Sequence, residues 1–212
     1  MKKLIYSLAL LSFMASCQNA PEGETTNATE KKEASTATTG TTYNVDVATS
    51  NVTFIGTKPV GTHTGLMHLS NGTLTVDNGN ITSGSFTIDM SKMEIKDADT
   101  NYSYKLVGHL LSPDFFDATK YPTSKFEITS CEALTNDSTG THRISGNLTM
   151  KDSTKNVTFP ANVTITETGL VATANFNIDR TQWGLHYGND KSLKDKFIYP
   201  EVKMLLSLNA TK

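Results

Sequence analysis

Histidines and acidic residues are the first candidates for chemistry in this sequence. His63 and His68 are five positions apart on an expected strand, and this odd spacing puts their side chains on opposite faces, so they cannot share a metal ion without a bulge. His109 lies close in sequence to Asp114 and Asp117, and three such groups could bind zinc. The alternative is that His109 bonds a loop carbonyl while one aspartate caps a short turn.

Nucleophilic catalysis has little support in the sequence. A hydrolase needs a serine, a histidine and an acid in a geometry that sequence cannot show, and the chain has no Gly-x-Ser-x-Gly motif. Its two cysteines are Cys17 and Cys131, and neither has a histidine partner in the sequence pattern. We therefore expect no enzyme, no catalytic residue, no cofactor and no metal site.

One charged segment could hold an anionic head group. Asp179 and Arg180 stand at the end of an expected strand, three residues before Trp183. If Arg180 points into a cavity mouth, it can bind an anion. Otherwise the pair is a structural ion pair, with the tryptophan covering the core.

Composition limits the fold that could position these groups. The chain has 212 residues, enough for one or at most two domains, and 33 of them are threonine. Threonine favours strands, which argues against a helical bundle. The formal charge of −2 excludes a strongly basic nucleic-acid binder.

The N-terminal residues are typical of a targeting sequence followed by a linker. Residues 1–16 combine Lys2 and Lys3 with an apolar run to Ala15, too short to span a bilayer permanently, which is typical of a secretory signal. Small residues before Cys17 resemble the lipobox of bacterial lipoproteins, which implies lipidation of that cysteine and a membrane partner. Residues 17–42 contain no large aliphatic or aromatic residue, so we expect a flexible tether. Gln18 favours the outer membrane by the sorting rule of some Gram-negative bacteria.

From residue 43 onward, apolar and polar residues alternate with a period of two. Phe86, Ile88 and Met90 share one face of a strand, and Phe176 and Ile178 share another. This alternation predicts about eight or nine antiparallel strands, in a closed barrel or a sandwich. Asn78-Gly79 is a hairpin signal. We expect Thr87 and Asn177 to face solvent.

One segment near residues 100–117 departs from the strand pattern. Its apolar residues fall at helical spacing, and Asp99 or Thr100 can cap the helix. Ser112-Pro113-Asp114 predicts a second short turn. We expect this helical insertion to cover an open barrel end and to act as a lid.

Several motifs, in order, resemble the YceI-like family of secreted bacterial proteins. They are KPVGTHTG (58–65), GSFTIDM (84–90), GHLLSPDFFD (108–117), YPTSKFE (121–127), GNLTMK (146–151), KNVTFP (155–160) and IDRTQWG (178–184). The resemblance covers residues 43–208 and implies a single antiparallel eight-stranded lipocalin-like β-barrel, assigned here to residues 43–212. It also implies an apolar cavity for a polyisoprenoid or similar amphiphilic lipid, and no enzymatic reaction.

The predicted cavity residues are the apolar side chains of the inward faces and of the lid. They are Phe54, Leu66, Phe86, Ile88, Met90, Leu106, Leu110, Phe115, Phe116, Phe126, Ile128, Leu148, Phe176, Ile178 and Trp183. The predicted function is a lipid-anchored protein of the cell envelope that binds such a lipid for storage, transport or stress protection. The alternative is a ligand-free adhesion module with a filled barrel. The two functions differ in the space left at Gly84 and Gly146. A cavity remains if this space is open, and none remains if phenylalanine and methionine side chains fill it. A homodimer is left open.

Overall fold

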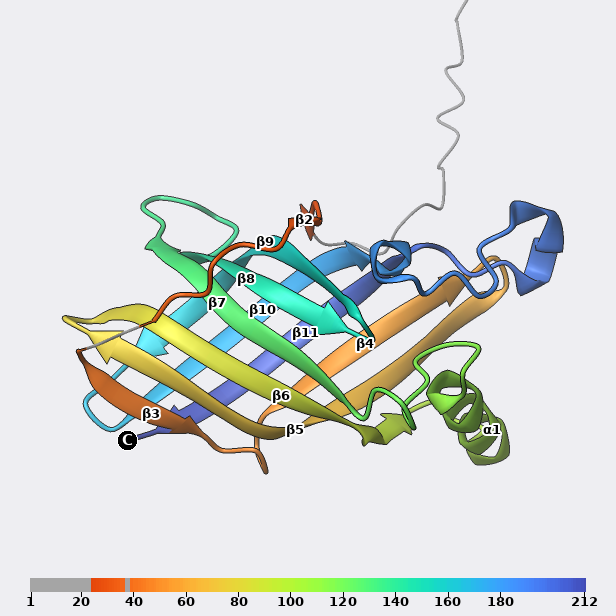
Figure 1. Ribbon diagram of the computed structural model, residues 1–212, viewed down its shortest axis with the longest axis horizontal. Helices are drawn as coiled ribbons and strands as arrows, with labels where there is room; N and C mark the ends of the chain where they lie inside the picture. The colour runs from red at the N-terminus through yellow and green to blue at the C-terminus, as the bar shows by residue number, and fades with distance from the viewer. Residues whose placement is uncertain (1–23, 37–38) are drawn as a thin grey trace, which may run out of the picture.

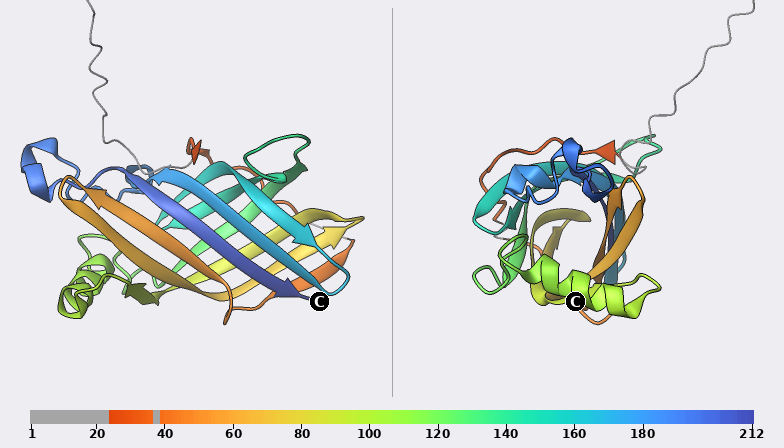
Figure 2. Two further views of the ribbon diagram at one scale, coloured as in Figure 1. Left: turned by 180° about the vertical axis from the view of Figure 1, so that it is seen from behind. Right: turned by 90° about the vertical axis from the view of Figure 1, so that its right-hand side faces the viewer.

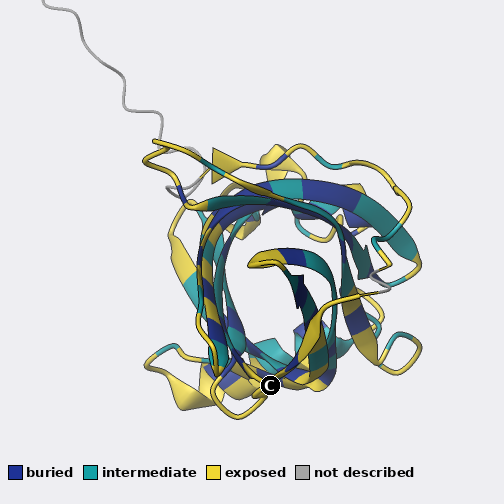
Figure 3. Ribbon diagram, turned by 90° about the vertical axis from the view of Figure 1, so that its left-hand side faces the viewer, coloured by how far each residue is buried: buried dark blue, intermediate teal, exposed yellow. Residues whose placement is uncertain are grey.

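Eight antiparallel strands close into a barrel in the computed structural model, which describes residues 24–36 and 39–212 (Figure 1). The barrel strands are β4 (Asn51–Lys58), β5 (Gly61–Asp77), β6 (Asn80–Ile95), β7 (Thr123–Ala133), β8 (His142–Met150), β9 (Ser153–Ile165), β10 (Gly169–Asp179) and β11 (Glu201–Thr211). Each pairs with the next along the chain, and β11 returns to β4. Short β3 (Thr41–Val45) bridges β11 and β5 beyond the end of β4. Seen along its axis, the wall is a complete ring (Figure 3). The predicted eight-stranded barrel is confirmed.

The period-two alternation sets which side chains enter the barrel. On β10, Phe176 and Ile178 line the interior, so Asn177 between them lies on the outer face. The β5–β6 connection is the expected two-residue turn, with φ of 51° at Asn78 and 80° at Gly79. The register predicted from the sequence therefore holds on this wall.

The helical insertion forms as predicted and lies at one end of the barrel. Helix α1 (Thr100–Leu111) begins at Asp99, whose carboxylate accepts the Tyr102 N–H at 3.0 Å. It crosses the end of the barrel at which β4 meets β5 (Figure 2). We call this end the mouth. The following residues 112–116 form turns, and Asp117 has a positive φ of 49°.

Residues 24–36, which the sequence predicts to be part of a flexible tether, lie along the outer wall instead. We call this segment the strap. Residues 161–165 of β9 pair with residues 170–174 of β10. From there toward the mouth the two strands do not pair with each other, so each has a free edge. In the strap, β1 (Glu24–Thr25) pairs with β10 and β2 (Thr29–Glu30) pairs with β9 along these free edges. The tether prediction is wrong for residues 24–36, because backbone hydrogen bonds to the unpaired strand edges hold the strap. Such bonds do not require apolar side chains.

Outward-facing asparagines fix the strap to the wall. The Asn147 side chain accepts the Lys32 N–H at 3.0 Å and donates to the Lys32 carbonyl at 2.7 Å. Asn156 donates to Asn147 at 3.2 Å. Asn177, predicted to face solvent, is buried beneath the strap, where its carbonyl accepts the N–H of Thr26 at 2.9 Å. Thr87 is partly exposed, so burial at Asn177 reflects the strap and not a change of register.

The predicted signal sequence and the lipidation site Cys17 fall outside the described residues. Within the described part of the chain, no helix has the length and apolar character needed to cross a bilayer.

The strap predicts an asymmetric effect of two substitutions at one contact. Asn147→Ala removes a buried amide and leaves the peptide groups of Lys32 without partners, so it should lower the free energy of unfolding by about 2–3 kcal/mol. Lys32→Ala removes only an exposed side chain and should cost less than about 0.5 kcal/mol. Urea denaturation followed by circular dichroism measures both. Equal small losses would show that the strap is not held by Asn147.

Candidate functional site

Two adjoining cavities occupy the barrel interior. The mouth cavity has a volume of about 250 Å³ and lies between the barrel, helix α1 and the loop after β10. The inner cavity has a volume of about 110 Å³ and is lined only by apolar residues. Ile88, Leu148 and Met204 line both, so the two cavities adjoin at these three side chains.

The structure places most of the predicted cavity residues on this space. The mouth cavity is lined by Phe54, Ile88, Met90, Leu106, Leu110, Phe115, Phe116, Leu148 and Ile178. The inner cavity is lined by Phe86, Ile88, Phe126, Ile128, Leu148 and Phe176. The strand positions and the lid are thus brought together as expected.

Two predicted residues line neither cavity. Leu66 lies between Gly65 and Met67, which face inward, so alternation turns it to the outer face. Trp183 lies in the 3₁₀ turn η1 (Arg180–Trp183) and is buried, with its indole N–H donating to the Leu148 carbonyl at 2.8 Å. The cavity prediction is wrong for both: Leu66 has the wrong parity, and Trp183 packs in the core.

Aromatic rings fill part of the inner space. Phe159 and Phe176 stack with ring centroids 4.0 Å apart, and Phe126 follows at 5.8 Å from Phe159. The Phe126 ring lies directly over Gly146, where an added Cβ would be 2.1 Å from the ring. The Phe126 ring therefore fills the space at Gly146. The two cavities are the volume that these rings leave empty.

The partners of the Arg180 guanidinium are backbone carbonyls, and not the Asp179 carboxylate of the ion pair that the sequence offered as one alternative. Asp179 caps η1 by accepting the Thr181 N–H at 2.9 Å. The buried guanidinium donates to three carbonyls of the following loop, those of Leu185, Ile198 (2.9 Å) and Tyr199 (3.3 Å). Burial lowers the pKa of Arg180, and the charge of Asp179 partly offsets this effect.

Arg180 holds the loop to the barrel and also presents its charge to the mouth cavity. It lines that cavity, with its guanidinium carbon 5.7 Å from the centre of the Phe115 ring. Lys58 and Lys196 line the same cavity from the β4 end and from the 3₁₀ turns η2 (Lys191–Lys196). Among the described lining residues there is no aspartate or glutamate. The polar side of the mouth cavity is therefore cationic.

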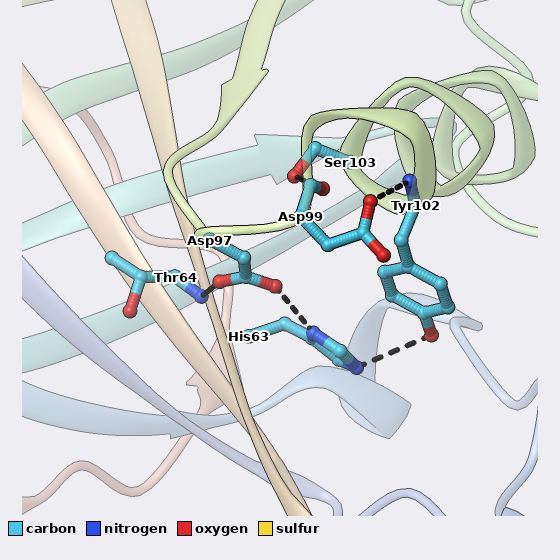
Figure 4. Close-up of polar contacts among 6 residues, drawn as sticks. All are labelled: His63, Thr64, Asp97, Asp99, Tyr102 and Ser103. Atoms are coloured by element: carbon cyan, nitrogen blue, oxygen red, sulfur yellow. Dashed lines mark hydrogen bonds and ion pairs between the residues drawn. The ribbon is translucent and has the colours of Figure 1, made fainter.

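A hydrogen-bonded group joins the lid to the barrel (Figure 4). Asp97 accepts the Thr64 N–H at 3.0 Å and lies 2.6 Å from His63 Nδ1. His63 Nε2 lies 3.4 Å from the Tyr102 hydroxyl, and the two rings stack at 5.2 Å. The start of α1 is thereby fixed to β5 at the mouth.

The end of α1 has a similar ring contact. His109 lies edge-on to Tyr187 at 4.4 Å and near Phe115 at 6.4 Å. It therefore packs as a lid residue. Within residues 24–36 and 39–212, no group of three histidine, cysteine or acidic side chains converges as a metal site.

Two possible nucleophiles of the described chain have structural surroundings. Ser124, on the mouth cavity, donates its hydroxyl to Met90 Sδ at 3.2 Å. Burial raises the pKa of the Cys131 thiol to about 11, so little reactive thiolate forms near neutral pH.

Several lining residues were missed by the sequence reasoning. Leu185, Tyr187 and Ile198 belong to an irregular loop that has no periodicity to read. Val202 and Met204 alternate on β11 and could have been found from that pattern.

The fit of Phe126 over Gly146 predicts a local effect of one added methyl group. Gly146→Ala should push the ring into the inner cavity and cost about 1–3 kcal/mol of unfolding free energy. Gly108→Ala is the matched control, because nothing lies near that position on α1 and alanine favours helix by about 1 kcal/mol. Thermal denaturation compares the two. A Gly146→Ala protein as stable as the parent would contradict the close packing.

The comparisons with known proteins agree with this geometry. The model of the YceI-like domain matches residues 43–210. No curated protein matches the chain. Among solved structures, Burkholderia cenocepacia BcnA has 23 % identity and a TM-score of 0.63 over 79 % of this chain and 99 % of its own.

Two further structures are similar in fold. A polyisoprenoid binding domain from Saccharophagus degradans, implicated in plant cell wall breakdown, has 13 % identity and a TM-score of 0.61 over 80 % of this chain and 97 % of its own. The Campylobacter jejuni YCEI protein has 15 % identity and a TM-score of 0.50 over 86 % of this chain and 90 % of its own.

Proposed function

The chain belongs to the YceI-like domain family, and from that premise we propose that its barrel binds an amphiphilic lipid of the polyisoprenoid type without covalent chemistry. A relative of the same fold is described as a polyisoprenoid binding domain, which supports this ligand class. The observation that carries the proposal is that a mouth cavity with a cationic side adjoins a wholly apolar inner cavity.

The apolar part of this space suits a hydrocarbon chain. Together the two cavities fall near the lower end of the ~300–1,000 Å³ typical of small-molecule sites. A chain that buries about 400 Å² of apolar surface would gain roughly 10 kcal/mol before the costs of ordering. The inner cavity offers no hydrogen-bonding side chain, so its affinity comes from burial alone. A filled adhesion module, the alternative, would not keep such a space.

The polar side of the mouth cavity suits the head group. Lys58, Arg180 and Lys196 present positive charge, and no carboxylate competes among the described lining residues. An anionic head at this position would have its chain directed inward, because only the inner cavity is wholly apolar. The head therefore sets orientation, and the chain supplies most of the binding energy.

Helix α1 acts as the lid in this proposal. Leu106, Leu110 and Phe116 lie on the mouth cavity, and the His63–Tyr102 and His109–Tyr187 contacts hold the two ends of the helix. A long chain can enter only if a covering element moves.

The proposed setting is the cell envelope, with Cys17 lipidated and the barrel on the outer-membrane or periplasmic side. A signal-like segment ending at Cys17 supports this placement. In that setting the protein would store or carry the lipid, or protect the cell under stress.

Native mass spectrometry before and after organic extraction tests the binding proposal. Protein purified from its own envelope should lose the mass of one amphiphilic lipid for each barrel on extraction. It should regain that mass when incubated with a prenyl phosphate. A protein that carries no extractable lipid and takes up none would contradict the proposal.

The lid contributes a separate expected outcome. Phe116→Ala enlarges the mouth cavity and weakens its cover, so lipid retained through purification should fall several-fold while the circular dichroism spectrum stays that of a β-barrel. Val171→Ala is the control, since Val171 is an exposed apolar residue of β10 that lines neither cavity. Equal lipid content in the two variants would show that the segment is only structural.

A further inference from the structure

Exposed apolar and aromatic side chains gather at the mouth. Seven large hydrophobic residues are exposed in residues 24–36 and 39–212, and five of them belong to the elements around the mouth, with exposed fractions between 41 % and 83 %. We call these five the rim patch: Val60, Tyr102, Tyr104, Tyr187 and Leu193. The other two lie away from the mouth: Val47 is in the β3–β4 connection, and Val171 is near the start of β10.

Four separate segments contribute to the rim patch. Val60 is in the β4–β5 turn, Tyr102 and Tyr104 are on α1, Tyr187 is in the loop between η1 and η2, and Leu193 is in η2. The β4–β5 turn, α1 and η2 lie at one end of the barrel in the side views of Figure 1 and of Figure 2 (left). Tyr102 and Tyr187 also line the mouth cavity, so the patch adjoins its opening.

We propose that the rim patch docks the mouth onto the head-group region of a lipid bilayer. This inference rests on the proposed function, because a lipid carried in the barrel must pass between the membrane and the cavity. Docked in this way, the opening faces the bilayer, and the chain of the lipid need not cross water.

The residue types fit a bilayer surface. Tyrosine is enriched where membranes meet water, because its ring is apolar and its hydroxyl is hydrated. A patch of exposed apolar residues at one end of a soluble domain marks an interaction site. Side chains on four separate segments, arranged around an opening, can insert among head groups without forming a flat protein interface.

The charges of the rim favour anionic lipids. The exposed segment 191–196 carries three lysines and one aspartate, and Lys105 is exposed on α1. The nearby Asp99 and Asp190 are the N-caps of α1 and η2, where the positive end of each helix partly offsets their charge. Lysines beside a membrane-facing patch can bind anionic head groups while their stems lie along apolar surface.

The strap places the proposed anchor near the same end. Glu24 pairs with Phe176, three residues before Asp179 at the mouth end of β10. Six residues separate Cys17 from Glu24, and a chain of that length reaches at most about 25 Å. A lipidated Cys17 is therefore compatible with a bilayer at the mouth.

Two environment-sensitive probes on exposed valines test the docking. In the full chain carrying Cys17→Ser and Cys131→Ser, either Val60→Cys or Val171→Cys is labelled with a nitrobenzoxadiazole dye. Vesicles of phosphatidylethanolamine and phosphatidylglycerol are then added. The emission at position 60 should rise several-fold and shift to the blue, whereas the emission at position 171 should not change. Because the leader segment leaves the barrel near the mouth, the labelled Val60→Cys protein is also tested with Tyr104→Ser and Leu193→Ser added. These changes should reduce its response if the rim patch docks, and leave it unchanged if the leader alone holds the mouth at the bilayer.

A second measurement uses variants that leave the cavity lining intact. Val60→Ser, Tyr104→Ser and Leu193→Ser together should lower the partition onto these vesicles about tenfold, since each removes exposed apolar surface. Val47→Ser with Val171→Ser is the control and should leave the partition unchanged. No response at position 60, equal responses at both positions, or a rim variant that changes only the oligomeric state would overturn the docking proposal.

Mass spectrometry of the bound lipid on the same samples separates the two proposals. Lipid in the barrel without a response at position 60 would overturn docking alone. Absence of lipid would overturn the proposed function.

Discussion

The interior of an eight-stranded barrel is just wide enough to be filled by its own side chains or to hold one small ligand. The rest of this structure depends on how that interior is filled. Alternation sends phenylalanine, isoleucine, leucine and methionine inward, and glycines such as Gly146 receive the largest rings. Two adjoining cavities remain, and the inner one has no polar lining residue. The inner cavity can therefore bind apolar matter by burial, while the polar side chains of the lining belong to the mouth cavity.

Polar chemistry is therefore confined to the mouth and to the outer wall. At the mouth, Arg180 holds the loop after β10 and presents its charge to the cavity, while His63 and Asp97 fix the start of the lid. On the wall, Asn147 and Asn156 bind the strap where strands β9 and β10 separate. The two arrangements have separate consequences: under the proposed function the first would control what enters the barrel, and the second completes its wall.

The alternation predicted antiparallel strands in a barrel or a sandwich, and the resemblance to the YceI-like family implied the barrel. The helix and most of the lining could be predicted because each depends on a local period. Phe86, Ile88 and Phe176 follow from alternation, and α1 follows from helical spacing after Asp99. Leu66 was wrongly predicted to face the cavity. Leu66 and Met67 are both apolar, so the alternation does not show which of the two faces inward. The strap was missed because the composition argument counts apolar area and not backbone hydrogen bonds at free strand edges. The loop around Tyr187 has no periodic pattern, so its contribution to the cavity lining could be found only from the three-dimensional structure.

The most direct measurement for the central claim is a crystal structure of the protein purified with its bound lipid. We expect continuous electron density for a chain that starts beside Arg180 and Lys58 and runs past Ile88 toward the Phe159–Phe176 stack. Density confined to the mouth would mean that the aromatic rings close the inner cavity to cargo. An interior without any such density, in protein that mass spectrometry shows to carry lipid, would place the lipid elsewhere and contradict the account.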